Sequence, residues 1–260
     1  MTQAKTTILL LSSGALAITA GCASGARSES RAYVARPVEQ LYNSAAVQLD
    51  RRSYDEAIGL FNEVERQHPY SEWARRASVM AAFAAYRARR YDEAITTAQR
   101  YVSLHPGSEG APYAYYIIAL SHFDQIIDVG RDQRTTELAK GALLDIVKRY
   151  PDSDYAQDAR LKLDMVNDQL AGKEMTIGRW YLRRNQHLPA INRFRTVVGE
   201  YQTTSHAPEA LHRLVEAYLS VGLTGQAKAA AAVLGHNHAD TIWYERTYDL
   251  MDRNDLIDAS

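Results

Sequence analysis

The chain has 260 residues, of which 30 are basic and 31 acidic, so its formal net charge is −1. This balance argues against a surface built for polyanions, and therefore against a nucleic-acid-binding function. A single cysteine, Cys22, excludes a framework of internal disulfides.

Residues 1–21 predict a signal peptide. Lys5 is the one charged side chain there, and it precedes an apolar run of about a dozen residues, too short to span a bilayer. Small residues precede Cys22, as a cleavage site requires. The pattern resembles the lipobox of bacterial lipoproteins, with Thr19 where leucine is usual. The resemblance implies N-palmitoyl and S-diacylglycerol chains on Cys22, and Ala23 in place of aspartate indicates the outer membrane.

Residues 22–37 are small, polar and basic, which predicts a flexible tether between the lipid and the folded body. The alternative is an ordinary secretory signal with an incidental cysteine. No second run of about 20 apolar residues follows, so no other segment is expected to span a membrane. The remaining length suffices for one large domain or for a repeat array.

Internal repeats favour the array. The stretches SYDEAIGLFNEVERQHPYSEWA (53–74) and RYDEAITTAQRYVSLHPGSEGA (90–111) share a YDEAI motif, and in both a histidine follows the alanine by eleven residues. The same frame, an alanine followed eleven residues later by His or Tyr, recurs at five anchors: Ala57, Ala94, Ala139, Ala190 and Ala227.

Each unit predicts a pair of helices. In the first unit, Ala57, Phe61 and Val64 follow the spacing of one buried helix face, and Pro69 ends that helix. The pattern is similar to that of tetratricopeptide repeats, with Ala45 as the small residue of the first helix. We therefore expect an all-α fold, an α-solenoid of about five tetratricopeptide-like helix pairs.

The spacing of the anchors also predicts how the units are organised. Longer intervals indicate two insertions, a loop at 128–136 and a lengthened helix at 154–185. Four serines are expected to cap the helices that follow them: Ser71, Ser108, Ser153 and Ser205. The expected parts are two N-terminal units at 38–111, a third unit with the long helix at 112–185, and two C-terminal units at 186–260.

Stacked helix pairs form a concave face suited to holding peptides or other proteins. We expect an aromatic floor with basic edges there, which would suit an extended peptide carrying aromatic side chains and a carboxylate. The alternative is that these aromatic residues only pack between helices. The expected groove residues are Tyr42, Leu49, Arg76, Val79, Phe83, Tyr86 and Arg87.

No pattern predicts catalysis, a metal site or a cofactor. His236 and His238 spell HNH with the residue between them, but the nuclease motif of that name spans separated residues. No third ligand stands at a useful metal-binding spacing. A Gly-rich phosphate loop and a GxSxG motif are both absent, and lipid would block Cys22. We therefore do not expect an enzyme.

Four segments resemble the BamD (ComL) family of outer-membrane lipoproteins: YDEAIGLFNEVERQHPYSEWA, RDQRTTELAKGALLDIVKRYPDSDYAQDA, LAGKEMTIGRWYLRRNQHLPAINRF and EALHRLVEAYLSVGLTGQA. The resemblance implies a non-enzymatic scaffold of the β-barrel assembly machinery that helps fold and insert barrel proteins from the periplasmic side. It implies that the N-terminal repeats receive the aromatic-ended targeting strand of unfolded substrates. It also implies that the C-terminal repeats dock the POTRA domains of the central barrel subunit, through Asn192 and Arg193, beside other assembly lipoproteins.

The sequence departs from the family pattern at two turns, YQTT in unit four and HNHA in unit five. Two other functions stay open beside the assembly scaffold. One is another tetratricopeptide lipoprotein, such as a secretin pilot or a cell-envelope division coordinator. The other is a cell-wall enzyme.

Overall fold

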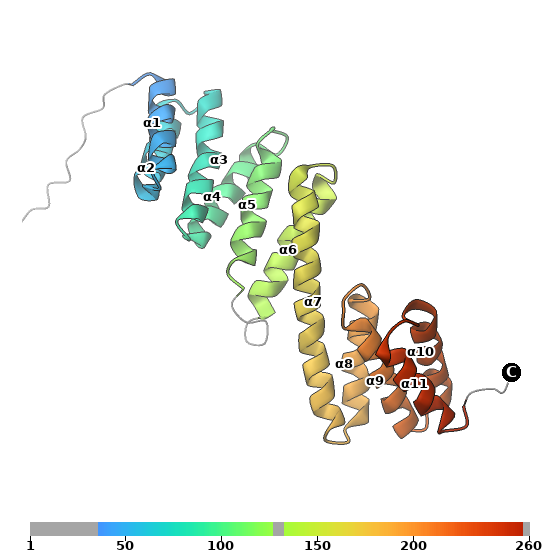
Figure 1. Ribbon diagram of the computed structural model, residues 1–260. Coiled ribbons are helices and arrows are strands. Elements are labelled where there is room, and N and C mark those ends of the chain that lie inside the picture. The colour runs from blue at the N-terminus through green and yellow to red at the C-terminus, as the bar shows by residue number, and fades with distance from the viewer. Residues whose placement is uncertain (1–35, 127–132, 257–260) are drawn as a thin grey trace, which may run out of the picture. The chain divides into compact units, whose positions relative to one another are not determined.

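A computed structural model describes residues 36–126 and 133–256, and within them the chain forms eleven α-helices and no strand (Figure 1). The signal peptide, Cys22 and nearly all of the tether lie outside the described residues. The helices are α1 (Val38–Asp50), α2 (Tyr54–Gln67), α3 (Glu72–Arg87), α4 (Tyr91–Leu104), α5 (Ala111–Phe123), α6 (Gln133–Arg149), α7 (Asp154–Leu182), α8 (His187–Glu200), α9 (Ala207–Ser220), α10 (Thr224–Asn237) and α11 (Ile242–Asp252). Among these helices, none has the length and apolar composition needed to cross a membrane.

The helices stack in chain order, as a solenoid requires. Each one packs against the next, and the odd-numbered helices also contact one another from α1 through α11. Among the described helices, the even-numbered ones make no contacts with each other. The odd-numbered helices therefore form a continuous layer, and the predicted all-α solenoid of helix pairs is confirmed.

The five anchor alanines explain why the pairs close so tightly. Each anchor is fully buried, because a methyl side chain lets two helices approach where a larger one would separate them. Eleven residues later the chain leaves each helix. His68, His105, Tyr201 and His238 are the residues that end α2, α4, α8 and α10.

Two of the four predicted serine caps are confirmed. The hydroxyls of Ser71 and Ser153 accept hydrogen bonds from the backbone of Ala74 and Ala156, which satisfies free N–H groups at the helix starts. The prediction is wrong for Ser108 and Ser205. Helices α5 and α9 begin later than those serines, each with a proline in its first turn. Ser108 instead meets the Tyr101 hydroxyl at 2.9 Å, and Ser205 donates to Asp168 at 2.8 Å.

Two further differences concern element boundaries. The predicted loop at 128–136 is wrong over its last four residues, because α6 already begins at Gln133; the first five lie outside the described residues. The predicted long helix is confirmed as α7, with 29 residues. A single helix, α11, follows the five helix pairs and packs on α9 and α10.

The long helix α7 packs on α8 through a glycine. A Cβ added at Gly178 would overlap the ring of Phe194, so only a residue without a side chain allows this approach. Phe194 and Phe61 are both completely buried, and they lie in two separate hydrophobic cores. These aromatic residues hold the C-terminal and N-terminal repeats together, respectively.

Candidate peptide pocket and docking face

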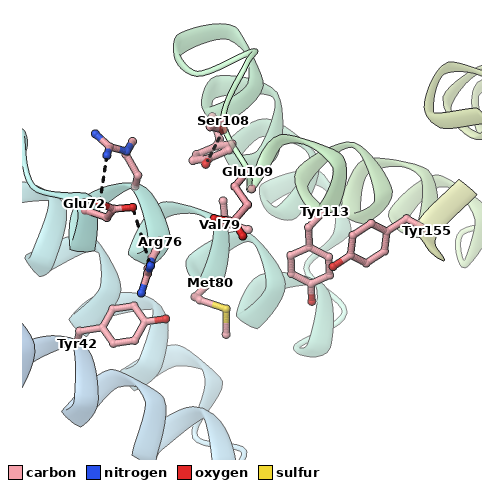
Figure 2. A pocket seen from close by; sticks show the side chains of 12 residues that line it. Tyr42, Glu72, Arg76, Val79, Met80, Ser108, Glu109, Tyr113 and Tyr155 are labelled. Atoms are coloured by element: carbon pink, nitrogen blue, oxygen red, sulfur yellow. Dashed lines mark hydrogen bonds and ion pairs between the residues drawn. The ribbon is translucent and has the colours of Figure 1, made fainter. Parts of the chain in front are cut away.

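A pocket of about 340 Å³ opens among the odd-numbered helices α1, α3, α5 and α7, with Tyr101 of α4 also in its lining (Figure 2). Most of its residues come from the N-terminal half of α3 and from the turn that precedes α5. Its lining residues are Tyr42, Glu72, Arg75, Arg76, Val79, Met80, Tyr101, Ser108, Glu109, Gly110, Tyr113 and Tyr155.

The repeat register explains why space exists at this point. Gly110 stands where the neighbouring units carry Trp73 and Tyr155, in a segment shared by three units. An added Cβ at Gly110 would lie 2.6 Å from the Tyr101 hydroxyl and 3.4 Å from a methyl of Val79. The glycine therefore keeps the pocket open between two aromatic positions. The three equivalent segments are SEWA (71–74), SEGA (108–111) and SDYA (153–156).

A row of aromatic rings lies along the layer of odd-numbered helices. The ring of Tyr42 lies 4.9 Å from that of Trp73, which joins α1 to α3. Phe83 of α3 lies 6.0 Å from Tyr113 of α5, and Tyr113 lies 5.3 Å from Tyr155 of α7. Figure 2 shows the last two rings side by side at one edge of the pocket. These spacings suit aromatic contacts, so the surface can accept further aromatic side chains.

Three of the seven predicted groove residues line the pocket itself, namely Tyr42, Arg76 and Val79. Val79 lies deep in its floor, with 6% of its surface exposed. Arg76 stands at the rim, 5.8 Å from the ring centre of Trp73.

The other four predicted residues lie elsewhere. Phe83 continues the aromatic row, and the Arg87 guanidinium lies 5.6 Å from its ring centre. The Tyr86 hydroxyl donates a hydrogen bond to Asp124 at 2.7 Å. Leu49 packs against the N-terminal hydrophobic core and is not among the residues that line the pocket.

Two tyrosines of this layer, Tyr86 and Tyr113, keep their hydroxyl protons. Burial, and then the hydrogen bond to Asp124, raise the pKa of Tyr86 well above its ordinary value. Burial also raises the pKa of Tyr113 to about 12. Neutral hydroxyls can donate and accept hydrogen bonds, so the pocket walls offer polar contacts as well as apolar ones.

The sequence prediction missed the contribution of the third and fourth units. Tyr113 and Tyr155 come from α5 and α7, whereas the prediction confined the groove to the first two units at 38–111. Glu109 lies within that range, in the turn before α5, but was not among the predicted residues. The repeated SEWA, SEGA and SDYA segments could have predicted this contribution from the sequence. Their alignment places Tyr155 and Gly110 at the position of Trp73.

The predicted docking residues lie on α8, outside this pocket. Asn192 is exposed, whereas Arg193 is half-buried and forms an ion pair with Glu174 of α7, with Nη1 3.1 Å from Oε2. The Glu174 side chain is only 10% exposed, so Arg193 neutralises a buried carboxylate. A partner that binds Arg193 would therefore also affect the ion pair that joins α8 to α7.

The HNH tripeptide lies at the end of α10. His236 is in the last turn of that helix and His238 follows it as the C-cap residue. Within residues 36–126 and 133–256, no group of three His, Cys, Asp or Glu side chains could hold a metal ion.

The fold and the pocket define a class of protein: a tetratricopeptide-like helical scaffold with a pocket formed mainly by its odd-numbered helices. Comparison with known proteins narrows the class. The YfiO family, described as "Outer membrane lipoprotein", matches residues 34–234. The BamD outer membrane protein assembly factor of Caulobacter vibrioides is 55% identical over 94% of this chain and 80% of its own length. The BamD outer membrane protein assembly factor of Rickettsia prowazekii is 42% identical over 90% of this chain and 92% of its own length.

The chain therefore belongs to the BamD family of outer membrane lipoproteins. Like those assembly factors it is a scaffold and not an enzyme. Among solved structures, a thermophilic tetratricopeptide protein of Thermus thermophilus matches with 17% identity and a TM-score of 0.39, covering 82% of this chain and 98% of its own.

Proposed function

We propose that this protein is a non-enzymatic scaffold of the β-barrel assembly machinery in the outer membrane. Its role is to help fold and insert β-barrel proteins, together with the other subunits of that machinery. The observation that carries the proposal is family membership over nearly the whole chain, combined with a pocket built by the repeat layer. A secretin pilot or division coordinator is the alternative that a helical scaffold alone would also allow.

The pocket is proposed to receive the C-terminal strand of unfolded barrel proteins. Such a strand ends in an aromatic residue and a free carboxylate. Val79, Met80 and Tyr113 offer apolar and aromatic surface to the ring, while Arg75 and Arg76 offer donors to the carboxylate. Chemical complementarity at both ends of one residue supports this occupant.

Replacing Tyr155 by alanine is expected to weaken peptide binding about tenfold, because one aromatic contact is worth about 1.4 kcal/mol in such a site. The measurement is fluorescence anisotropy with a labelled ten-residue peptide that ends in phenylalanine with a free carboxylate. Tyr70→Ala serves as the control, since Tyr70 is 97% exposed and does not line the pocket. Equal affinity of both variants would place the peptide elsewhere.

The C-terminal repeats are proposed to dock the POTRA domains of the central barrel subunit. Asn192 and the exposed part of Arg193 would form part of that contact. An arginine fork suits a partner carboxylate, and Arg193 uses only one of its terminal nitrogens on Glu174 among the described residues. These features support the docking face.

Membrane attachment is proposed to run through Cys22. The description of the family as an outer membrane lipoprotein supports lipid chains on this cysteine, the only one in the sequence. Several acyl chains anchor a protein more firmly than one. The scaffold would then face the periplasm, where unfolded barrel proteins arrive.

A further inference from the structure

We propose that Glu72 is a resident carboxylate that occupies Arg75 and Arg76 until the terminal carboxylate of a peptide displaces it. The inference rests on the proposed peptide-binding function and assigns a specificity-determining residue to the same pocket. Figure 2 shows Glu72 joined to Arg76, which is directed toward Tyr42, and Glu72 also forms an ion pair with Arg75.

The contacts of Glu72 are loose. Its two carboxylate oxygens lie 3.7 Å from Arg75 and 3.9 Å from Arg76, which is longer than a charge-assisted hydrogen bond. By contrast, Arg100 holds Glu65 through two bonds of 2.5 and 2.8 Å. The Glu72 side chain is also 65% exposed, so water screens its ion pairs. A well-oriented carboxylate can therefore replace it.

One of the two arginines, Arg76, has a contact that does not involve Glu72. Arg76 lies over the Trp73 ring, and its charge counteracts the rise in the pKa of Tyr42 that burial causes. Both arginines belong to the first turns of α3, where the helix dipole also favours a negative charge. A carboxylate that entered the pocket would therefore meet two positive charges in its lining.

The exchange predicts how Glu72 changes the affinity of the pocket for peptides with and without a terminal charge. An entering carboxylate replaces the Glu72 contacts with its own, so both arginines keep a negative partner. A peptide that ends in an amide carries no charge that could replace them, so Glu72 keeps its contacts while that peptide binds. Glu72 would thus lower the affinity for free-acid peptides, because they must displace it, and would leave amidated peptides nearly unaffected, because they do not.

The repeat itself supplies a matched control. Glu109 occupies the same position of the SEGA segment that Glu72 occupies in SEWA, and it lines the same pocket. Glu109 forms no ion pair with the described residues. Glu72→Gln and Glu109→Gln therefore remove one negative charge each from one pocket, and only the first frees the arginines.

The test compares full-length protein with Glu72→Gln and Glu109→Gln in detergent, by anisotropy, with a phenylalanine-ended peptide as free acid and as amide. We expect Glu72→Gln to tighten binding of the free acid about fivefold, the scale of two exposed ion pairs, and to leave the amide within about twofold. Glu109→Gln removes a charge without freeing an arginine, so it should tighten the free acid by less than about twofold and leave the amide unchanged. Circular dichroism confirms that both variants are folded.

The outcomes separate the two proposals. If Glu72→Gln changes the acid and the amide equally, or matches Glu109→Gln, the exchange is overturned and peptide binding stands. If Glu72→Gln weakens the free acid, Glu72 contributes to binding and the exchange is again overturned. If neither peptide binds any form of the protein, both the exchange and the proposed peptide-binding function fail.

Discussion

Replacing Arg193 by glutamate is expected to lower the free energy of unfolding by about 2–3 kcal/mol. The substitution removes the only described counter-charge of Glu174 and places a second carboxylate beside it. Because Glu174 is nearly buried, water cannot compensate the lost ion pair. Urea denaturation followed by circular dichroism measures the change.

A second substitution separates stability from docking. Glu174→Gln removes the buried charge and keeps the shape of the side chain, so the double variant Arg193→Glu, Glu174→Gln should recover most of the lost stability. If Arg193 contacts a POTRA domain, the double variant remains defective in binding although it is folded. A single Arg193→Glu variant that is as stable as the wild type would contradict the ion pair.

Replacing Phe194 by alanine should cost more, about 3–5 kcal/mol, because it empties a fully buried ring site in the C-terminal core. The ring packs directly on Gly178, so α7 has no side chain there that could fill the void. Thermal and urea unfolding both report the loss.

The matched control for Phe194 lies on the same helix. Leu188 of α8 is 64% exposed, and Leu188→Ala is expected to stay within about 0.5 kcal/mol of the wild type. A loss below about 1 kcal/mol for Phe194→Ala would mean that the C-terminal core can collapse around the cavity. It would also mean that the packing of α7 on α8 does not depend on this ring.

The repeat frame made most of the fold predictable. Five units repeat one local pattern: a fully buried alanine is followed eleven residues later by a His or Tyr at the end of the helix. The helix pairs and the long helix α7 follow from that periodicity. Helix α11 could not be predicted in this way, because no sixth anchor alanine marks it. It packs on the side of α9 that would otherwise be left exposed.

The functional surface was harder to predict, because it depends on contacts between units. Arg76 and Val79 could be placed in the groove by helical spacing alone. Spacing could not show that Gly110 opens the pocket, since that depends on Tyr101 and Val79 of other helices. In the same way, the partner of Arg193 lies on a different helix, and only packing shows it.

The serine caps show how local rules compete. Ser71 and Ser153 precede ordinary helix starts, and the capping rule holds. After Ser108 and Ser205, a proline lies in the first turn of the next helix, and the helix begins at the preceding alanine instead. The freed serine hydroxyls then bond to Tyr101 and Asp168.

The central claim is that this protein is a subunit of the β-barrel assembly machinery. Affinity purification of the full-length, tagged protein from detergent-extracted outer membranes, followed by mass spectrometry, tests that claim most directly. We predict that a β-barrel protein with POTRA domains co-purifies in near-equal amount, and that it is lost with the double variant Arg193→Glu, Glu174→Gln. Recovery of a secretin or a division protein in its place, with no such barrel protein, would contradict the account.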